Sequence, residues 1–293
     1  MLPPNDMEWQ KILARLDDLL LNAAERYLRL RRVSGADIER GNNILEGTLG
    51  AGSEPDYNDS AVVAAYAFKY LARRVTSLLG ALMFLDDRAL PHRVLDVASG
   101  SDATSIALHL RFPGRSMSVD AVEPSREMRT LGDQFDLGAG RAVSRKPGTF
   151  RDIVSGGLGL DPGAYDLIVM STGFPYDTDW DDDFWNSLAA RMAAAAAEAS
   201  TVIAIESQAK ARILVRSEMA FRATERFRTQ QWCCHDMPEA VRQPSTLQRS
   251  TLMLQRYYPQ GHPVQTWNPI RREYVVVARE GAMVARRHSP SSK

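Results

Sequence analysis

The sequence is poor in cysteine and carries no excess charge of either sign. Its 293 residues include two Cys, which are adjacent at Cys233 and Cys234, so no two separated cysteines can cross-link the fold through a disulfide. This favours a reducing compartment. The 36 Lys and Arg residues balance 36 Asp and Glu residues. The chain therefore lacks the global positive field that gives non-specific affinity for nucleic acid, although a local basic patch is not excluded.

Long apolar runs are also missing. Runs such as residues 61–68 are far shorter than the ~20 apolar residues that a membrane helix needs. The first residues, MLPPNDMEW, show neither the basic nor the apolar segment of a secretory signal. These absences predict a cytoplasmic protein without membrane contact. The apolar fraction of 44% and the charged fraction of 25% are typical of a globular protein.

Residues 1–90 are expected to form an N-terminal helical cover. Apolar residues recur at spacings of three and four over residues 6–32, which predicts an amphipathic helix. The Gly-rich, polar stretch 41–59 is interpreted as a long loop. Residues 59–80 are apolar on most sides, which predicts a buried helix.

After Pro91, short β-rich runs alternate with helical segments, as in βαβ units with a mostly parallel sheet. The expected strands are 94–99, 118–123, 165–171, 201–207, 250–258 and 273–279. The expected helices are 102–112, 125–137, 183–199 and 208–229. Because no helix separates 250–258 from 273–279, these two strands are expected to form an antiparallel pair at the sheet edge. Residues 281–293 are expected to be a disordered tail.

The segment 94–128 carries the strongest functional signal. Its first strand contains Asp96 and leads into a turn of small residues, Ala98 to Ser101, before a helix. Such a turn lets a ligand approach backbone N–H groups. The second strand ends in Glu123, about twenty residues further on, where a carboxylate can accept the ribose hydroxyls of a nucleoside.

The turn does not have the Gly-x-Gly-x-x-Gly pattern of dinucleotide sites. Asp102 is expected to place a negative charge where a pyrophosphate would lie, which disfavours NAD and FAD. S-adenosylmethionine (SAM) has no phosphate and carries an amino group and a sulfonium, so acids suit it. Asp96 is the candidate partner of the amino group, directly or through water.

These residues resemble motif I and the following acidic strand of class I SAM-dependent methyltransferases. The resemblance places the residues matching Asp96, Ala98, Gly100 and Glu123 around SAM, and Met128 near the adenine. YDLIVMSTGFPY (165–176) resembles the family's fourth motif, whose strand end faces the transferred methyl group. The remaining candidate cofactor contacts are Ser99, Ser101, Pro124, Ser171 and Thr172. The chain departs from the family at Ala98 and Asp102, where Gly is commoner.

The resemblance implies an α/β fold with a Rossmann-like, seven-stranded, mostly parallel sheet. An antiparallel C-terminal hairpin would end that sheet, and the N-terminal helical extension would precede it. Residues 91–280 would form the SAM-binding catalytic domain.

A narrower resemblance joins YNDSAVVAAYAFKYLARRVTSLLGAL, VEPSREMRTLG, IESQAKARILVR and CCHDMP to the mitochondrial small-ribosomal-subunit methyltransferase-like proteins and their bacterial relatives. Those relatives bind an iron–sulfur cluster through spaced cysteines. Adjacent Cys233 and Cys234 cannot provide four ligands, so neither a cluster nor any metal is expected.

The acceptor side of the site is less defined. Candidate general bases are Tyr176, Asp177 and His235, and candidate substrate contacts are Tyr57, Phe174, Tyr176 and Glu206. The leading hypothesis is methyl transfer from SAM to a small molecule, with specialised metabolism as the expected context. Alternatives are transfer or cyclisation of the aminocarboxypropyl arm, which releases methylthioadenosine, and an rRNA methyltransferase or ribosome-assembly role. A non-catalytic SAM-binding module is a further alternative, and the sequence leaves the oligomeric state open.

Overall fold

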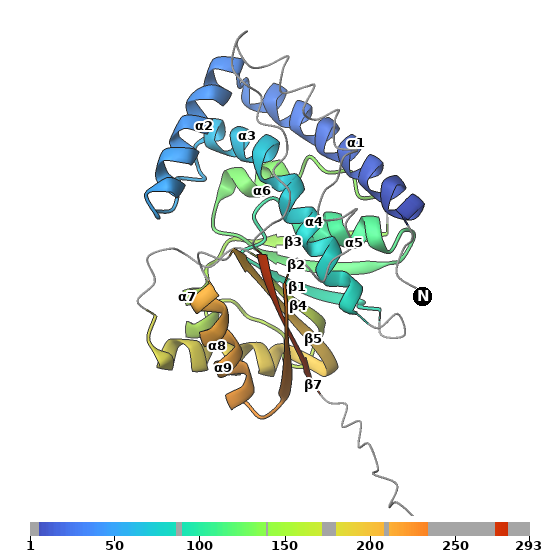
Figure 1. Ribbon diagram of the computed structural model, residues 1–293, viewed down its shortest axis with the longest axis vertical. Coiled ribbons are helices and arrows are strands. Elements are labelled where there is room, and N and C mark those ends of the chain that lie inside the picture. Colours follow the sequence, from blue (N-terminus) through green and yellow to red (C-terminus); the bar gives the residue numbers. More distant parts are fainter. Residues whose placement is uncertain are drawn as a thin grey trace, which may run out of the picture.

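The computed structural model describes residues 6–85, 90–138, 140–171, 180–207, 211–233 and 273–280. Its helices are α1 (Asp6–Arg31), α2 (Gly35–Gly50), α3 (Ser60–Lys69), α4 (Leu71–Ala81), the 3-10 helix η1 (Leu82–Phe84), α5 (Ala103–Arg111), α6 (Arg126–Gly132), α7 (Phe150–Ser155), α8 (Asp182–Ala195) and α9 (Ala211–Ala223). Its strands are β1 (Arg93–Val97), β2 (Met117–Val122), β3 (Arg141–Lys146), β4 (Tyr165–Ser171), β5 (Ala196–Ser207), β6 (Phe227–Cys233) and β7 (Glu273–Glu280). Helices cover both faces of one sheet (Figure 1).

The described strands form a seven-stranded sheet in the order β3-β2-β1-β4-β5-β7-β6. Strands β1 to β5 pair in parallel, whereas β7 pairs antiparallel with both β5 and β6. The α/β prediction of a Rossmann-like, largely parallel sheet behind N-terminal helices is therefore confirmed. The expected pairing of 250–258 with 273–279 is wrong, because β5 and β6 occupy both edges of β7. Residues 250–258 themselves lie outside the described residues.

Two hydrophobic clusters form, one on each face of the sheet. One face packs against α1 to α6, and this single cluster runs from Trp9 of α1 to Val94 of β1 without a break between the N-terminal helices and the sheet. The other face packs against α7 to α9. Side chains of a strand alternate between the faces, so Val94 lies in the first cluster and Leu95 in the second. The N-terminal helices are thus packed against one face of the sheet.

The first difference from the sequence prediction lies in the N-terminal helices. Residues 41–50 were expected to be loop but belong to α2, which begins with a capping box between Ser34 and Asp37. Gly41 has a packing role there: a Cβ at this position would lie 2.0 Å from the backbone oxygen of Ala61 in α3. Residues 41–50 are therefore helical despite their glycines, and Gly41 allows α2 and α3 to pack closely.

Other element boundaries also differ from the sequence predictions. The expected helix over 59–80 is two helices, with Tyr70 between α3 and α4. The alanine-rich helix expected over 183–199 ends at Ala195, and β5 begins at the next residue, Ala196. The helix expected over 208–229 ends by Ala223, since residues 227–233 pair with β7. Within the described residues, no helix combines the length and the apolar character needed to cross a bilayer.

Candidate functional site

A cavity of about 230 Å³ lies at the carboxyl ends of β1, β2 and β4, beneath the N-terminal helices. Open α/β sheets bind ligands at this edge, outside the ends of their strands. The described residues that line the cavity are Glu54, Tyr57, Tyr66, Arg74, Asp96, Ala98, Ser99, Gly100, Ala103, Thr104, Glu123, Pro124, Met128 and Ser171.

The turn after β1 has a left-handed backbone at three alternate positions. The φ angles are 56° at Ala98, 57° at Gly100 and 65° at Asp102. Ala98 and Asp102 were the two departures from the family pattern, and both adopt the conformation that glycine favours. Inside the turn, the N–H of Asp102 donates to the carbonyl oxygen of Ser99 at 3.0 Å. The side chains at 98 and 102 therefore do not prevent a glycine-like turn.

The Glu123 carboxylate joins the turns after β1 and β2. Its Oε2 accepts the backbone N–H of Gly100 at 2.9 Å, and its Oε1 accepts that of Ser125 at 2.8 Å. Burial raises the pKa of Glu123, and these two hydrogen bonds oppose the rise. A carboxylate has about four lone-pair sites, so each oxygen of Glu123 retains acceptor capacity toward the cavity.

Asp96 presents a buried carboxylate to the cavity. One oxygen hydrogen-bonds to Thr104, whereas Oδ2 has no hydrogen-bond partner among the residues that the structure describes. The hydroxyl of Ser99 is also buried and lacks a partner within that same set. Burial raises the pKa of Asp96 well above its ordinary value, against the Thr104 hydrogen bond and with help from the charges of Asp102 and Glu123. An orphaned buried acceptor of this kind fits a cationic donor.

Asp102 does not play the part that the sequence suggested. It is fully buried and does not line the cavity; its carboxylate forms an ion pair with Arg145. Burial raises the pKa of Asp102 to about 6, while the Arg145 charge acts in the opposite direction. The acids that would repel a pyrophosphate are instead Asp96 and Glu123 of the cavity itself.

The helical cover supplies one wall of the cavity. Tyr57, in the segment between α2 and α3, lies edge-on to Tyr66 of α3, with ring centroids 5.8 Å apart. Tyr66 hydrogen-bonds to Arg74 of α4. Arg74 is the one cationic side chain among the described lining residues, and Glu54 adds a carboxylate.

Most predicted cofactor contacts that fall in the described residues meet at this cavity. They are Asp96, Ala98, Ser99, Gly100, Glu123, Pro124, Met128 and Ser171, and the predicted substrate contact Tyr57 joins them. Ser101 and Glu206 are buried and do not line the cavity. Thr172, Phe174, Tyr176, Asp177 and His235 lie outside the described residues.

The cavity is also lined by five residues that were not predicted from the sequence: Glu54, Tyr66, Arg74, Ala103 and Thr104. Ala103 and Thr104 directly follow the recognised turn, so their position was a usable signal. No local pattern marked Tyr66 and Arg74, because only tertiary packing brings their helices, α3 and α4, next to the sheet.

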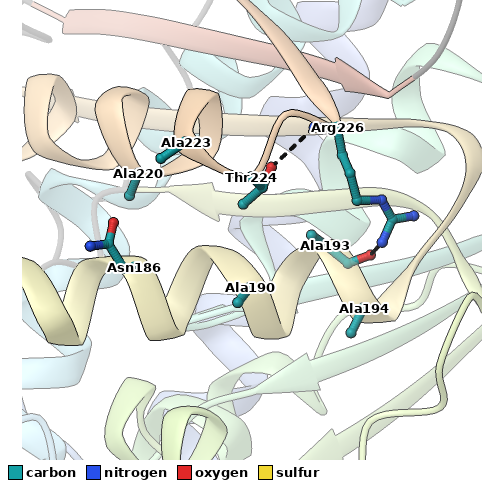
Figure 2. Close-up of a pocket in the computed structure, with 8 residues that line it drawn as sticks. All are labelled: Asn186, Ala190, Ala193, Ala194, Ala220, Ala223, Thr224 and Arg226. Atoms are coloured by element: carbon teal, nitrogen blue, oxygen red, sulfur yellow. Dashed lines mark hydrogen bonds between the residues drawn. The ribbon is translucent and has the colours of Figure 1, made fainter.

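A second cavity, of about 540 Å³, lies between α8 and α9 (Figure 2). Alanine side chains provide much of its lining, together with Asn186 and Thr224. Its one charged lining residue among those described, Arg226, donates to the carbonyl oxygen of Ala193. The described lining of this second cavity therefore lacks the buried carboxylates that line the first.

No protein-family model matches the chain, and no curated protein is significantly similar to it. Its backbone resembles several solved structures at low identity. A proposed O-methyltransferase of Nostoc punctiforme is 13% identical, with 83% of this chain and 69% of that chain covered and a TM-score of 0.48. The plantazolicin methyltransferase in complex with S-adenosylhomocysteine (SAH) is 11% identical, with coverages of 84% and 98% and a TM-score of 0.47. Human N-acetylserotonin methyltransferase in complex with SAM is 13% identical, with coverages of 90% and 66% and a TM-score of 0.41.

All three TM-scores are below 0.5. The narrower ribosomal resemblance gains no support, because no family model and no curated protein matches the chain.

Proposed function

We propose that this protein is a SAM-dependent methyltransferase that acts on a small molecule. The observation that carries the proposal is the pair of carboxylates, Asp96 and Glu123, at the ends of adjacent parallel strands in one cavity. One carboxylate would hold the amino group and the other the ribose of a single adenosine ligand. Their charges favour a cationic ligand over one that carries a pyrophosphate.

The adenosine half would lie against Glu123, Pro124 and Met128. Glu123 already has both oxygens fixed by backbone N–H groups and can accept the ribose hydroxyls with its remaining lone pairs. Met128 of α6 gives a polarizable thioether to contact the adenine ring.

The amino-acid half would lie over the turn after β1. The unpartnered Oδ2 of Asp96 and hydroxyl of Ser99 suit an ammonium group, which has three protons to donate. Arg74, held by Tyr66, suits the carboxylate at the same end of the ligand. These residues give each charged group of the amino-acid end a partner of opposite charge.

When bound, SAM supplies an electrophilic methyl group on its sulfonium. The task of the protein is to orient the acceptor at near-attack distance and to exclude water. The aromatic wall of Tyr57 and Tyr66 would serve the second task. Tyr176, Asp177 and His235 remain proposed as bases for an oxygen or carbon acceptor, with Phe174 as a proposed substrate contact.

We propose residues 1–90 as the cover, 91–280 as the catalytic domain and 281–293 as a tail. We favour a small-molecule acceptor because the chain has balanced charge and a helical cover over the cavity. A cytoplasmic location is part of this proposal. The acceptor itself is to be found by experiment.

The test is to incubate the protein with methyl-labelled SAM and fractions of small-molecule extract, and to identify the nucleoside product. Formation of SAH together with a labelled acceptor supports methyl transfer. Formation of methylthioadenosine would replace methyl transfer with chemistry of the aminocarboxypropyl arm. Unchanged SAM in all fractions would contradict turnover.

A single substitution tests whether the cofactor binds in this cavity. Glu123→Gln keeps the size of the side chain but replaces one carboxylate oxygen with a donor, so ribose binding should weaken by about tenfold or more. Isothermal calorimetry with SAH and with NAD measures this. Undiminished SAH binding by Glu123→Gln, or preferential binding of NAD, would overturn the assignment of the site.

A further inference from the structure

We propose that Tyr27 and Arg31 of α1 are positioning residues for the adenosine half of the cofactor, and that they act through Glu127 of α6. This inference rests on the proposed function, because it assumes that adenosine binds beside Glu123. It extends the cofactor site to residues of the first helix that do not line the cavity.

Helix α6 directly controls the adenosine side of the cavity. It starts two residues after Pro124, and its Met128 lines the cavity. Ser125, its N-cap, donates its backbone N–H to Glu123 and accepts the N–H of Met128 at 3.0 Å. A shift of α6 would therefore move both Glu123 and Met128.

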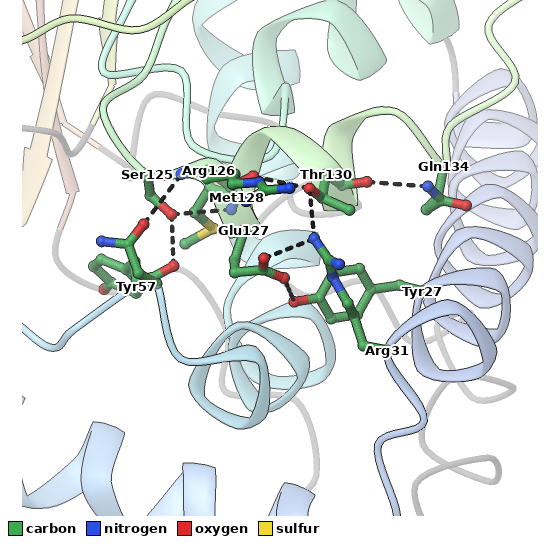
Figure 3. A network of polar contacts seen from close by, with 10 residues as sticks. Tyr27, Arg31, Tyr57, Ser125, Arg126, Glu127, Met128, Thr130 and Gln134 are labelled. Atoms are coloured by element: carbon green, nitrogen blue, oxygen red, sulfur yellow. Dashed lines mark hydrogen bonds and ion pairs between the residues drawn. The ribbon is translucent and has the colours of Figure 1, made fainter.

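Seven residues are too few for α6 to be stable without tertiary contacts. Glu127 on its first turn receives two donors from α1, as Figure 3 shows. The hydroxyl of Tyr27 donates to Oε2 at 3.0 Å, and the guanidinium of Arg31 donates to Oε1 at 2.6 Å. Arg31 also donates to the hydroxyl of Thr130 at 3.1 Å, one turn further along α6. We call these four residues the α1–α6 clasp.

The side chains of the clasp are largely shielded from solvent. The Glu127 side chain is 13% exposed and that of Arg31 is 27% exposed, while Tyr27 is fully buried. Burial and the neighbouring Glu127 charge raise the pKa of Tyr27, so its hydroxyl stays protonated and remains a donor. The Nη2 nitrogen of the Arg31 guanidinium donates to both Glu127 and Thr130, so one planar group links two positions of α6.

A second tie holds the start of α6. The hydroxyl of Ser125 donates to the carbonyl oxygen of Tyr57, and the N–H of Arg126 donates to Oδ1 of Asn58 at 3.1 Å (Figure 3). Because Tyr57 lines the cavity, this tie joins the start of α6 to the cover beside the cavity, and the clasp joins the first turn of α6 to α1. The orientation of α6 is thus set by the cover.

The variants compare two arginines of the same helix. Arg31→Gln breaks the clasp, and Tyr27→Phe removes one buried hydroxyl with little change of shape. Arg29→Gln is the matched control, since the Arg29 side chain is 75% exposed and its partner, Glu25, lies on α1 itself. Arg29 lies 3.8 Å from the Glu25 carboxylate and donates from Nε to the Glu25 carbonyl oxygen at 3.3 Å. Arg31→Lys keeps the charge but loses the planar guanidinium.

Calorimetry with SAH and with adenosine, at a temperature where circular dichroism shows each variant folded, gives the readout. We expect Arg31→Gln and Tyr27→Phe to weaken both ligands by the same factor, roughly 3- to 10-fold, while Arg29→Gln binds like wild type. Arg31→Lys should recover part of the loss. A purely structural role would lower the melting temperature and leave both affinities unchanged.

Affinities of Arg31→Gln equal to those of Arg29→Gln, or a loss confined to SAH, would overturn the inference. If wild type binds neither SAH nor adenosine, the proposed function itself fails. The wild-type measurement therefore separates the two failures.

Discussion

The backbone N–H of Gly100 and the side-chain carboxylate of Glu123 are hydrogen-bonded at 2.9 Å, across the turns that follow β1 and β2. This bond makes the small-residue turn and the strand-end acid one structural unit. The acid that we assign to the ribose is thereby oriented by the same turn that we assign to the amino-acid end of the ligand. A ligand that spans both strands would meet a preorganised site.

The first prediction concerns the pH dependence of ligand binding. Burial raises the pKa of Asp96, so on acidification it is protonated earlier than an ordinary carboxyl and can no longer hold an ammonium ion. SAH affinity should therefore rise with pH through the raised pKa, by up to about tenfold per pH unit below it, and binding there should release a proton. Calorimetry in buffers of different ionisation enthalpy measures both effects.

Adenosine is the reference ligand for that experiment, because it lacks the amino group. The pKa of Glu123 is raised as well, so the adenosine profile reports Glu123, and the difference between the two profiles reports Asp96. Asp96→Asn should weaken SAH by about 10- to 100-fold and abolish this difference. Parallel pH profiles for SAH and adenosine in wild type would refute the role of Asp96.

The second prediction assigns the carboxylate of the ligand to Arg74. Arg74→Gln should weaken SAH by about 10- to 100-fold, the value of a hydrogen bond between charged groups. It should not weaken a decarboxylated SAH analogue, which has nothing for the guanidinium to bind. Equal losses for both ligands would mean that Arg74 acts on the shape of the cavity and not on the carboxylate.

The third prediction concerns the backbone at Ala98, whose φ is 56°. A left-handed conformation costs a residue with a Cβ about 1–2 kcal/mol, and glycine avoids this cost. Part of that stabilisation is lost again, because glycine makes the unfolded chain more flexible. Ala98→Gly should therefore raise the free energy of unfolding by about 0.5–1 kcal/mol in a urea titration.

Ala103→Gly, in the first turn of α5, is the control for that substitution. Its backbone is helical, so glycine should lower the free energy of unfolding by roughly 0.5–1 kcal/mol. If both variants lose stability equally, Ala98 is not strained in the folded protein.

The fourth prediction compares two glycines of α2. Gly41→Ala places a Cβ against the backbone of Ala61, where no rotamer change can relieve the clash, and should cost about 3 kcal/mol or more of unfolding free energy. Gly47→Ala meets no atom within 4 Å and should gain up to about 1 kcal/mol from helix propensity. Denaturant titrations of the two variants give the answer, and a neutral Gly41→Ala would refute the close contact of α2 with α3.

The sequence alone determined the parts of this protein that are set by short-range patterns. The parallel strands β1, β2, β4 and β5, the helix α1, and the turn from Ala98 to Ser101 with Glu123 beyond it were all predictable from periodicity and spacing. Each depends on side-chain alternation, helical spacing or a local turn, which neighbouring residues decide.

Only the tertiary structure decided the remainder. Close packing of α2 on α3 makes Gly41 a helix residue, and pairing with β7 makes residues 227–233 a strand. Arg74 reaches the cavity because its helix packs over the sheet. Asp102 turns to Arg145, a partner 43 positions away in the chain. These outcomes depend on contacts between distant segments, and no local pattern encodes which distant backbone or charge a residue will meet.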